Sequence, residues 1–366
     1  MPKFIQSLDL NEQFFHKIVA PLLKEHFPDL VYSAARLGKG SDVLGYDTEM
    51  STDHDWGIRM QLFLSVEKYG KWETAVAKTL RHNLPQTFLD HSVHFSSASK
   101  DGTRLMIHQK EGLVDHRIEI TTIPQFFHNH MRLDLTKEIT VLDWLTTPQQ
   151  LLLGVTKGRV FVDGLQELKP IRQKLAYFPH DVWLYLMAMQ WVRIGQEEHF
   201  VGRTGFVGDE IGSQLLAGRL VHDVMLLCFL MEKRYAPYPK WFGTGFGELE
   251  CAAILAPILE AILSVSNWQA RENQLCSAYQ FVANRHNQLN ITPPLATECV
   301  PFHERPFHTI DAERFATAIK QVIQDPTILA IKSNVGSIDQ FSNSTDLQSY
   351  PALHRRLGTL YEDQHD

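Results

Sequence analysis

The sequence is poor in cysteine. Its four cysteines, Cys228, Cys251, Cys276 and Cys299, lie far apart in the 366 residues, and no two of them form a CxxC pair. Zinc ribbons and disulfide-rich folds require closely spaced cysteines. We therefore expect neither, and interpret these residues as reduced thiols packed as small apolar side chains. The 18 histidines likewise contain no HExxH motif or other close ligand spacing.

An excess of positive charge is also lacking. The chain has 35 Lys and Arg against 42 Asp and Glu, a formal net charge of -7. A surface that binds nucleic acid by charge alone is usually strongly basic. The balance favours a small or cationic acceptor over nucleic acid, although a local basic groove remains compatible with it.

Long apolar runs are missing as well. Met1–Asn11 has no basic segment followed by an apolar run, and no stretch reaches the roughly 18 apolar residues of a membrane span. We therefore expect a cytoplasmic protein without a membrane partner.

The first part of the chain mixes strand and helix patterns. Residues 11–27 have apolar side chains at helical spacing, Pro28 ends that helix, and 65–83 predicts a second one. Strand patterns occupy residues 30–37, 54–64, 93–96, 104–108 and 113–123. This order predicts an α+β domain over residues 1–145.

The later part is helical in pattern. Apolar residues recur at helical spacing over residues 181–194, 213–234, 248–265, 268–287 and 311–324. We expect a mostly α-helical domain over 146–332, followed by an irregular tail over 333–366 that is rich in Ser, Asn and Asp.

Two aspartates stand out near the end of a turn-rich stretch. Asp53 and Asp55 are separated by one residue at the start of the expected strand 54–64, and alternate residues of a strand project from one face. Two carboxylates that converge repel each other unless a cation lies between them, and hard oxygen ligands suit Mg²⁺. The spacing therefore predicts a divalent metal site.

A glycine-serine turn precedes these acids. Gly40 allows the backbone to approach phosphate groups closely, and the Ser41 hydroxyl with neighbouring amides can hold terminal phosphate oxygens. Metal ions and a grip on the triphosphate are the two requirements of nucleotidyl transfer.

A third carboxylate would complete the site from an adjacent strand. Glu119 lies between Ile118 and Ile120, so it would point away from their apolar face. Asp115 has the same parity and remains the alternative; we favour Glu119 because its flanks alternate more clearly.

This pattern resembles the DNA polymerase β-like nucleotidyltransferase superfamily. The shared signature, over about the first 125 residues, is Gly-Ser, then residues 42–52, then Asp-x-Asp and a later carboxylate between hydrophobic residues. The phrases GSDVLGYDTEMSTDHDWG and CFLMEKRYAPYPKWFGTGF also resemble an uncharacterised bacterial nucleotidyltransferase-like family with a helical C-terminal domain. His54 and Trp56 depart from the superfamily, which usually has short apolar residues there.

The resemblance implies specific roles. It implies a polymerase β-like fold for the first domain, two divalent metals (Mg²⁺ or Mn²⁺) on Asp53, Asp55 and Glu119, and a triphosphate held by Gly40 and Ser41. In the antibiotic nucleotidyltransferases, which this architecture resembles, the helical domain contributes the carboxylate that deprotonates the acceptor. Here the candidates are Glu198, Asp209 and Glu210, each of which is also a plausible capping acid.

Three further residues are candidates for nucleotide binding. Arg219 lies on an otherwise apolar helix pattern, where it is also spaced to pair with Asp223. Tyr235 and Lys240 belong to a proline-stiffened segment rich in aromatic residues. Such a segment can contact phosphates or a base, or simply pack its aromatic rings.

The leading prediction is therefore a transferase that moves a nucleoside monophosphate from a nucleoside triphosphate, ATP being favoured, to an acceptor hydroxyl. Two alternatives remain open. One is a nucleotide-binding or regulatory module without turnover, and the other is an antitoxin-like enzyme that adenylylates a protein. An oligomer is compatible with the sequence.

Overall fold

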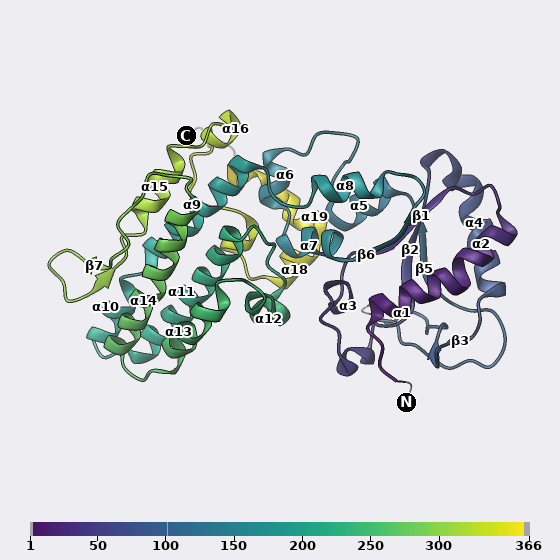
Figure 1. Ribbon diagram of the computed structural model, residues 1–366, viewed down its shortest axis with the longest axis horizontal. Helices are drawn as coiled ribbons and strands as arrows, with labels where there is room; N and C mark the ends of the chain where they lie inside the picture. The colour runs from purple at the N-terminus through teal and green to yellow at the C-terminus, as the bar shows by residue number, and fades with distance from the viewer. Residues whose placement is uncertain (1–2, 101, 362–366) are drawn as a thin grey trace. The chain divides into compact units, whose positions relative to one another are not determined.

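The computed structural model describes residues 3–100 and 102–361. The chain forms two compact units, and each contains a minor segment beside its main one. The first, here called the sheet unit, comprises Met1–Ile139 and Leu151–Ala176, and the second, the helical unit, comprises Thr140–Gln150 and Tyr177–Asp366. The fold class is α+β, as expected, with a mixed sheet in the first unit and mostly helices in the second (Figure 1).

A four-stranded mixed sheet organises the sheet unit, with strand order β5-β2-β1-β6. The strands are β1 Tyr32–Arg36, β2 Arg59–Leu64, β5 Arg117–Thr121 and β6 Arg159–Asp163. β1 runs antiparallel to both β2 and β6, whereas β2 and β5 are parallel. Arg59 pairs with Arg117 and Gln61 with Glu119, so these four residues share one face of the sheet.

The opposite face carries the main apolar core. Met60, Leu62, Leu64 and Ile118 are buried there, together with apolar side chains of the N-terminal helices. The covering helices are α1 Ser7–Phe14, the π-helix η1 Phe15–Val19, α2 Ala20–His26 and α4 Val66–Asn83. The chain leaves α2 just before Pro28, and α4 ends just before Pro85.

Shorter helices cover the face that carries the polar residues. They are α5 Ile123–Met131, α7 Gln149–Lys157 and α8 Leu168–Lys174. Phe126 of α5 packs edge-on against Phe63 of β2, with ring centroids 5.5 Å apart. Arg172 of α8 donates to Val155 O at 2.9 Å and Gly158 O at 2.8 Å, which satisfies carbonyls at the end of α7.

Some strand predictions in the sheet unit are wrong. Residues 93–96 and 104–108 form no regular strand; a single bridge between Phe95 and Met106 joins them, flanked by hydrogen bonds from Ser96 N to Leu105 O at 2.8 Å and from Ile107 N to His94 O at 3.1 Å. The short pair β3 Thr87–Phe88 and β4 His91–Ser92 lies nearby. The alternation in these runs therefore corresponds to a short antiparallel contact and not to full strands.

The division of the chain also differs from a single boundary near residue 145. β6 pairs along β1, so residues 151–176 belong with the sheet although they follow the first residues of the helical unit. A strand that returns after a helical segment cannot be assigned to its sheet from local pattern alone.

The helical unit contains the helices that the periodicity predicts. They are α9 His180–Glu197, α11 Glu210–Met231, α13 Ala252–Ser264, α14 Trp268–Gln288 and α15 Glu313–Lys320. The shorter elements are α6 Val141–Thr146, α10 Phe200–Phe206, η3 Pro239–Trp241, α12 Phe242–Gly247, β7 Val300–Pro301, β8 His308–Thr309 and α16 Pro326–Leu329.

One of these helices is apolar enough to resemble a membrane span. α11 has the length and the apolar composition of a membrane-spanning helix, but 61% of its most apolar window is buried inside the structure. Residues such as Leu220, Val224 and Leu227 are fully buried in the helical unit. The apolar character of α11 is therefore accounted for by its place in a packed core.

The polar, glycine-rich run over residues 196–210 contains a helix, α10. Its glycines allow close packing, because a Cβ on Gly202 would lie 2.6 Å from Phe307 and one on Gly205 would lie 2.2 Å from Trp268. Glycine here serves helix contact and not loop flexibility.

The tail is not irregular within its described part. It forms α17 Ile338–Phe341, α18 Thr345–Ser349, α19 Pro351–His354 and η4 Arg355–Tyr361. Ser337 and Gln340 form a capping box at the start of α17, and Ile338 and His354 are buried. Polar residues of this segment, such as Ser337 and Gln340, therefore cap short helices.

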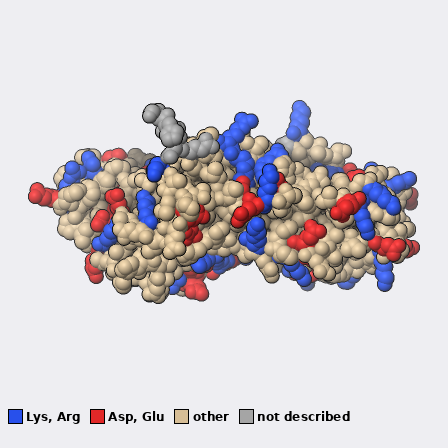
Figure 2. Space-filling view, turned by 90° about the horizontal axis from the view of Figure 1, so that it is seen from above, with Lys and Arg blue, Asp and Glu red and all other residues tan. Residues whose placement is uncertain are grey.

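Charges of both signs are interspersed over the face drawn in Figure 2. This distribution matches a chain whose 35 basic and 42 acidic residues nearly balance.

Candidate active site

A glycine-rich loop follows β1 and is held tightly by α7. Gly38 N donates to Gly154 O at 3.0 Å, and a Cβ on Gly154 would lie only 2.3 Å from Gly38 O. Gly154 therefore permits two backbone segments to meet without an intervening side chain. The loop leads into the single-turn helix α3, Ser41–Leu44.

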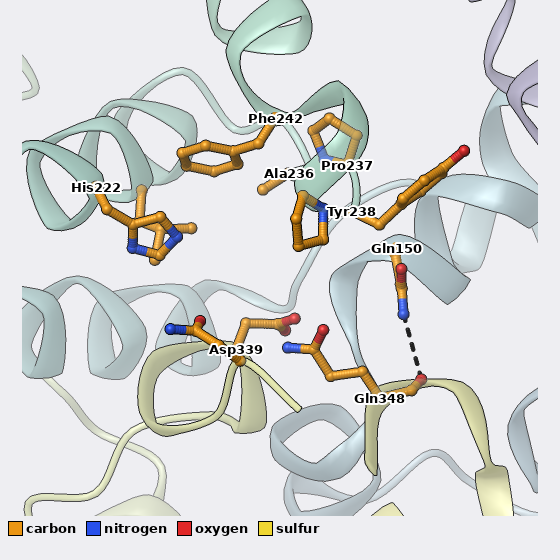
Figure 3. A pocket seen from close by; sticks show the side chains of 11 residues that line it. Gln150, His222, Ala236, Pro237, Tyr238, Phe242, Asp339 and Gln348 are labelled. Carbon is orange, nitrogen blue, oxygen red and sulfur yellow. Dashed lines mark hydrogen bonds between the residues drawn. The ribbon is translucent and has the colours of Figure 1, made fainter. Parts of the chain in front are cut away.

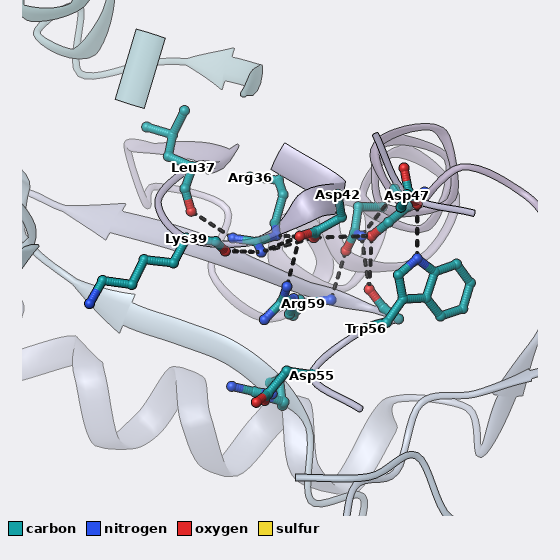
Figure 4. Close-up of polar contacts among 12 residues, drawn as sticks. Arg36, Leu37, Lys39, Asp42, Asp47, Asp55, Trp56 and Arg59 are labelled. Carbon is teal, nitrogen blue, oxygen red and sulfur yellow. Dashed lines mark hydrogen bonds and ion pairs between the residues drawn. The ribbon is translucent and has the colours of Figure 1, made fainter. Parts of the chain in front are cut away.

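Beside this loop lies a buried ionic cluster that the sequence did not reveal. Asp42 is 1% exposed and accepts from Arg36 Nε at 2.9 Å and Arg59 Nη2 at 2.8 Å (Figure 4). Burial alone would raise the pKa of Asp42, but the two guanidinium groups hold that pKa below its ordinary value. Burial and repulsion from Arg59 lower the pKa of Arg36 to about 10.

The cluster explains the glycine at position 40. Gly40 has φ of +131°, and a Cβ there would lie 2.1 Å from Asp42 Oδ1 and 2.7 Å from Arg59 Nη2. Any larger residue would be strained in its backbone and would collide with the ion pairs. Because two guanidinium groups share one carboxylate, the net charge beside the loop is positive.

A pocket of about 290 Å³ opens between the loop and the polar face of the sheet. Its lining includes Gly38 and Lys39 of the loop, Gln61 of β2, Glu119 of β5 and His130 of α5. Gln61 Oε1 accepts from Leu37 N at 3.0 Å, and Gln61 Nε2 donates to Glu119 Oε2 at 3.4 Å. Gln61 thus connects the loop to the carboxylate.

Glu119 has the orientation expected from alternation. It is exposed, whereas Ile118 beside it is 5% exposed on the core face. The alternative, Asp115, lies before β5 and forms an ion pair with Arg104 at 2.9 Å. Of the two predicted third carboxylates, Glu119 is the one that lines the pocket.

Asp53 and Asp55 are not on a strand, so their expected conformation is wrong. Asp53 ends the 3-10 helix η2, Glu49–Asp53, with its side chain 63% exposed, and its Oδ1 accepts from His54 N at 2.9 Å. Asp55 has φ of +46° and Gly57 φ of +113°, values incompatible with a strand, and β2 begins only at Arg59.

Asp55 nevertheless reaches the polar face of the sheet. Its carboxylate forms an ion pair with Arg117, which is two residues before Glu119 on the same face of β5. Two residues of strand span about 7 Å. The ion pair with Arg117 therefore links Asp55 to β5, but Asp55 is not among the residues that line the pocket with Glu119.

Helix α1 fixes the segment between Asp55 and β2. Asn11 Nδ2 donates to Gly57 O at 3.0 Å, and Asn11 Oδ1 accepts from Arg59 N at 2.7 Å. Asp47 Oδ2 accepts from Ser7 N at 2.8 Å and from Trp56 Nε1 at 2.9 Å. These buried bonds give Trp56, a departure from the superfamily pattern, a structural role.

Within the described residues, no three Asp, Glu, His or Cys side chains are grouped to hold a metal ion. The three predicted ligands differ in setting: Asp53 is in solvent, Asp55 is paired with Arg117, and Glu119 bonds Gln61. The carboxylates suit Mg²⁺ chemically, but they do not form a closed three-ligand cage here.

The predicted acids of the helical unit make structural contacts. Glu198 is 7% exposed and accepts from Ile310 N at 2.7 Å and Ala312 N at 3.1 Å, while burial raises its pKa to about 7. Asp209 caps α11 by accepting from Gly212 N at 2.8 Å. Glu210 accepts from Arg271 Nη1 at 3.1 Å. Because each carboxylate secures local structure, none is favoured as a general base.

The predicted nucleotide-binding residues of this unit also have local partners. Arg219 pairs with Glu197 and not with Asp223. Tyr235 is 4% exposed, and its ring centroid lies 5.0 Å from that of Phe178. Lys240 Nζ lies 5.2 Å from the Trp241 ring centroid. Of the two roles expected for this aromatic segment, nucleotide contact and ring packing, Tyr235 has the second, because its side chain is part of the core.

Sequence reasoning missed Arg36, Asp42, Gln61 and Arg117. The available signal was polar residues at strand positions, with Arg59 and Gln61 alternating among apolar residues of β2. That alternation marks a polar sheet face, although it does not show which charges pair.

Comparison with known proteins gives limited similarity. Residues 144–242 match a family described as "Domain of unknown function (DUF4037)". A search of curated proteins finds no significant match. A solved nucleotidyltransferase-like protein from Exiguobacterium sibiricum 255-15 aligns over 85% of this chain and 89% of that one, with 11% identity and a TM-score of 0.32. That similarity is too low to carry a functional assignment.

Proposed function

We propose that this chain is a nucleotidyltransferase that moves a nucleoside monophosphate from a nucleoside triphosphate to an acceptor hydroxyl, releasing pyrophosphate. The observation that carries the proposal is the pocket in which the glycine-rich loop, Arg36 and Glu119 meet. Such a pocket combines an approach for phosphate groups with a carboxylate on a rigid sheet.

The basic groups would bind the phosphates. Arg36 and Arg59 share the single carboxylate of Asp42, so positive charge exceeds negative charge in this cluster. Arg117, which pairs with Asp55, lies opposite Arg59 in the sheet. Guanidinium groups bind phosphate oxygens through paired hydrogen bonds. Backbone amides near Gly40 and the Ser41 hydroxyl would add neutral donors.

Mg²⁺ or Mn²⁺ would be held by Asp53, Asp55 and Glu119. Mg²⁺ is usually bound through one or two carboxylates together with substrate phosphates and water, so a closed protein cage is not required. When bound, it supplies charge neutralisation at the transferred phosphoryl group. Asp55 would have to exchange Arg117 for the cation, which would leave Arg117 available to a phosphate.

Nucleotide binding tests the proposal without knowledge of the acceptor. Isothermal titration calorimetry should show ATP binding that requires Mg²⁺ and is lost in EDTA. Asp55→Asn should weaken Mg²⁺-dependent binding at least about tenfold, as expected for loss of a charged contact. Glu138→Gln, which removes an exposed carboxylate from the same unit, is the matched control and should bind like the parent. Equal binding in EDTA, or an unaffected Asp55→Asn variant, would refute the proposal.

A nucleotide-binding module without turnover is the second candidate. The ion pair between Asp55 and Arg117 favours it, because that contact occupies a predicted metal ligand. Pyrophosphate release distinguishes the two: a transferase should release it from ATP with some member of a panel of small hydroxyl compounds, whereas a binding module should return ATP unchanged.

The proposal also includes ATP as the nucleotide, a small molecule as the acceptor and a cytoplasmic location. Protein adenylylation has no supporting observation in the described residues.

A further inference from the structure

The helical unit contains a second pocket that the proposed function does not use. It has a volume of about 200 Å³. One wall is apolar and consists chiefly of Pro237, Tyr238 and Phe242, while Asp339 and Gln348 belong to the polar wall that faces it (Figure 3). A slot of this kind suits a small ligand with one apolar and one polar side.

Two glutamines contribute amide groups to the polar wall. Gln150 Nε2 donates to Gln348 O at 3.3 Å, and Gln348 Nε2 donates to Ser342 O at 2.8 Å. An amide that donates to the backbone with its nitrogen directs its carbonyl oxygen elsewhere. No lysine or arginine is among the residues that line this pocket, so its charge is that of the Asp339 carboxylate with His222 nearby.

Asp339 is held in place by the backbone. Gln149 N donates to Asp339 Oδ2 at 3.0 Å, and Gln149 Oε1 accepts from Ala236 N at 3.0 Å. Gln149 thus joins the segment that carries the acid to the segment that carries the aromatic wall. Because the opposing walls are fixed relative to each other, little conformational entropy is lost when a ligand binds between them.

The aromatic wall is also ordered. The Phe242 ring stacks on His222, with ring centroids 4.8 Å apart and an interplanar angle of 30°. The faces of aromatic rings attract cations, and proline rings provide a flat apolar surface beside them.

We propose that this pocket binds a small organic cation, a primary ammonium or amidinium carried on an apolar group. The charged nitrogen pairs with Asp339 and donates to the amide oxygens, while the apolar group lies against Phe242 and Tyr238. Phosphate and carboxylate ligands are disfavoured because they would meet a like charge.

The electrostatic setting of Asp339 makes cation binding at this pocket depend on pH. Burial raises the pKa of Asp339 to about 7, while the Gln149 N–H and the neighbouring His222 act in the opposite direction. The phenol of Tyr361 also lies within electrostatic range. Ammonium affinity should therefore increase as the pH rises through about 7 and the carboxyl group ionises.

Three ligands of similar shape test the charge requirement on the intact protein: 2-phenylethylammonium, neutral 2-phenylethanol and anionic phenylacetate. Calorimetry should show the ammonium binding at least about tenfold more tightly than the alcohol, and phenylacetate more weakly still. Equal binding of ammonium and alcohol, or no ammonium binding at millimolar concentration, would overturn the proposal.

Variants locate the site. Asp339→Asn keeps an acceptor for Gln149 N but removes the charge, so it should reduce ammonium affinity at least about tenfold and abolish its increase with pH. Asp346→Asn removes an exposed carboxylate from the same tail and should leave the ammonium affinity and its increase with pH unchanged. Phe242→Leu, which keeps apolar volume without the π face, should weaken the ammonium more than the alcohol.

Thermal unfolding of each variant establishes that it is folded. Unchanged ammonium binding by folded Asp339→Asn and Phe242→Leu proteins would contradict the assignment. The assays contain no nucleotide, so their outcome is independent of whether the sheet unit is a nucleotidyltransferase.

Discussion

Asp42 holds two guanidinium groups in the interior of the sheet unit. If its charge is removed, Arg36 is left buried at 4% exposure beside a second cation. Removing one partner of a buried ion pair typically costs about 3–5 kcal/mol. We predict that Asp42→Asn lowers the free energy of unfolding by about this amount, measured by urea denaturation.

Asp53 provides the matched control for that measurement. Its side chain is 63% exposed, so Asp53→Asn should change stability by no more than about 0.5 kcal/mol. Similar losses in the two variants would show that the Asp42 cluster does not contribute as described.

For single residues, part of the site could be predicted from the sequence. The orientation of Glu119 was predictable because Ile118 and Ile120 mark the buried face of a strand. The conformation of Asp55 was not, since a left-handed backbone at an aspartate leaves no pattern in the sequence. Neither was the pairing of Arg36 with Asp42, because charge partners depend on tertiary packing.

Two elements, α7 and the loop after β1, meet through their backbones. A Cβ on Gly154 would lie 2.3 Å from Gly38 O, so Gly154→Ala must separate α7 from the loop. We expect a loss of about 1–3 kcal/mol in the free energy of unfolding, typical of overpacking. The loop displacement should also weaken ATP binding if the proposed site is correct.

Gly70 in α4 provides a control, because the same substitution there should raise the free energy of unfolding instead of lowering it. It is exposed inside a helix, and no atom lies within 4 Å of a Cβ built there. Gly70→Ala should therefore stabilise the protein by about 0.5–1 kcal/mol. A destabilised Gly70→Ala, or a neutral Gly154→Ala, would be inconsistent with this account.

Long periodic elements were predictable, whereas some short ones, such as α10 and β6, were missed. The prediction of a helix over residues 268–287 agrees closely with α14, Trp268–Gln288, because its pattern spans many turns. α10 was missed because its seven residues include two glycines, which are poor helix formers. β6 was missed because its three central residues, 160–162, are all apolar, so the run lacks the alternation that marks a strand with one buried face.

The order of the chain through the two units has consequences for the whole molecule. A fragment of residues 1–145 follows the boundary suggested by sequence, but it lacks β6 and the Gly154 carbonyl that accepts from Gly38 N. We predict that it unfolds without a cooperative transition, whereas a fragment of residues 1–176 unfolds cooperatively. Circular dichroism during urea denaturation measures the difference; a cooperative transition of the 1–145 fragment, with the same midpoint as that of 1–176, would contradict the prediction.

The fold class was predictable at this scale because strand and helix patterns are concentrated in different parts of the chain. The division into units was not. Strand pairing between β1 and β6 joins residues more than 120 positions apart, and only tertiary structure reveals such a contact.

The late arrival of β6 also bears on biosynthesis. While the ribosome adds residues one at a time, β1 can pair with β2 long before residues 159–163 have been translated. During that interval one edge of the nascent sheet has unsatisfied backbone groups, which favour association with other chains. The growing polypeptide should depend on chaperones most strongly in that interval, and less once β6 has emerged from the exit tunnel.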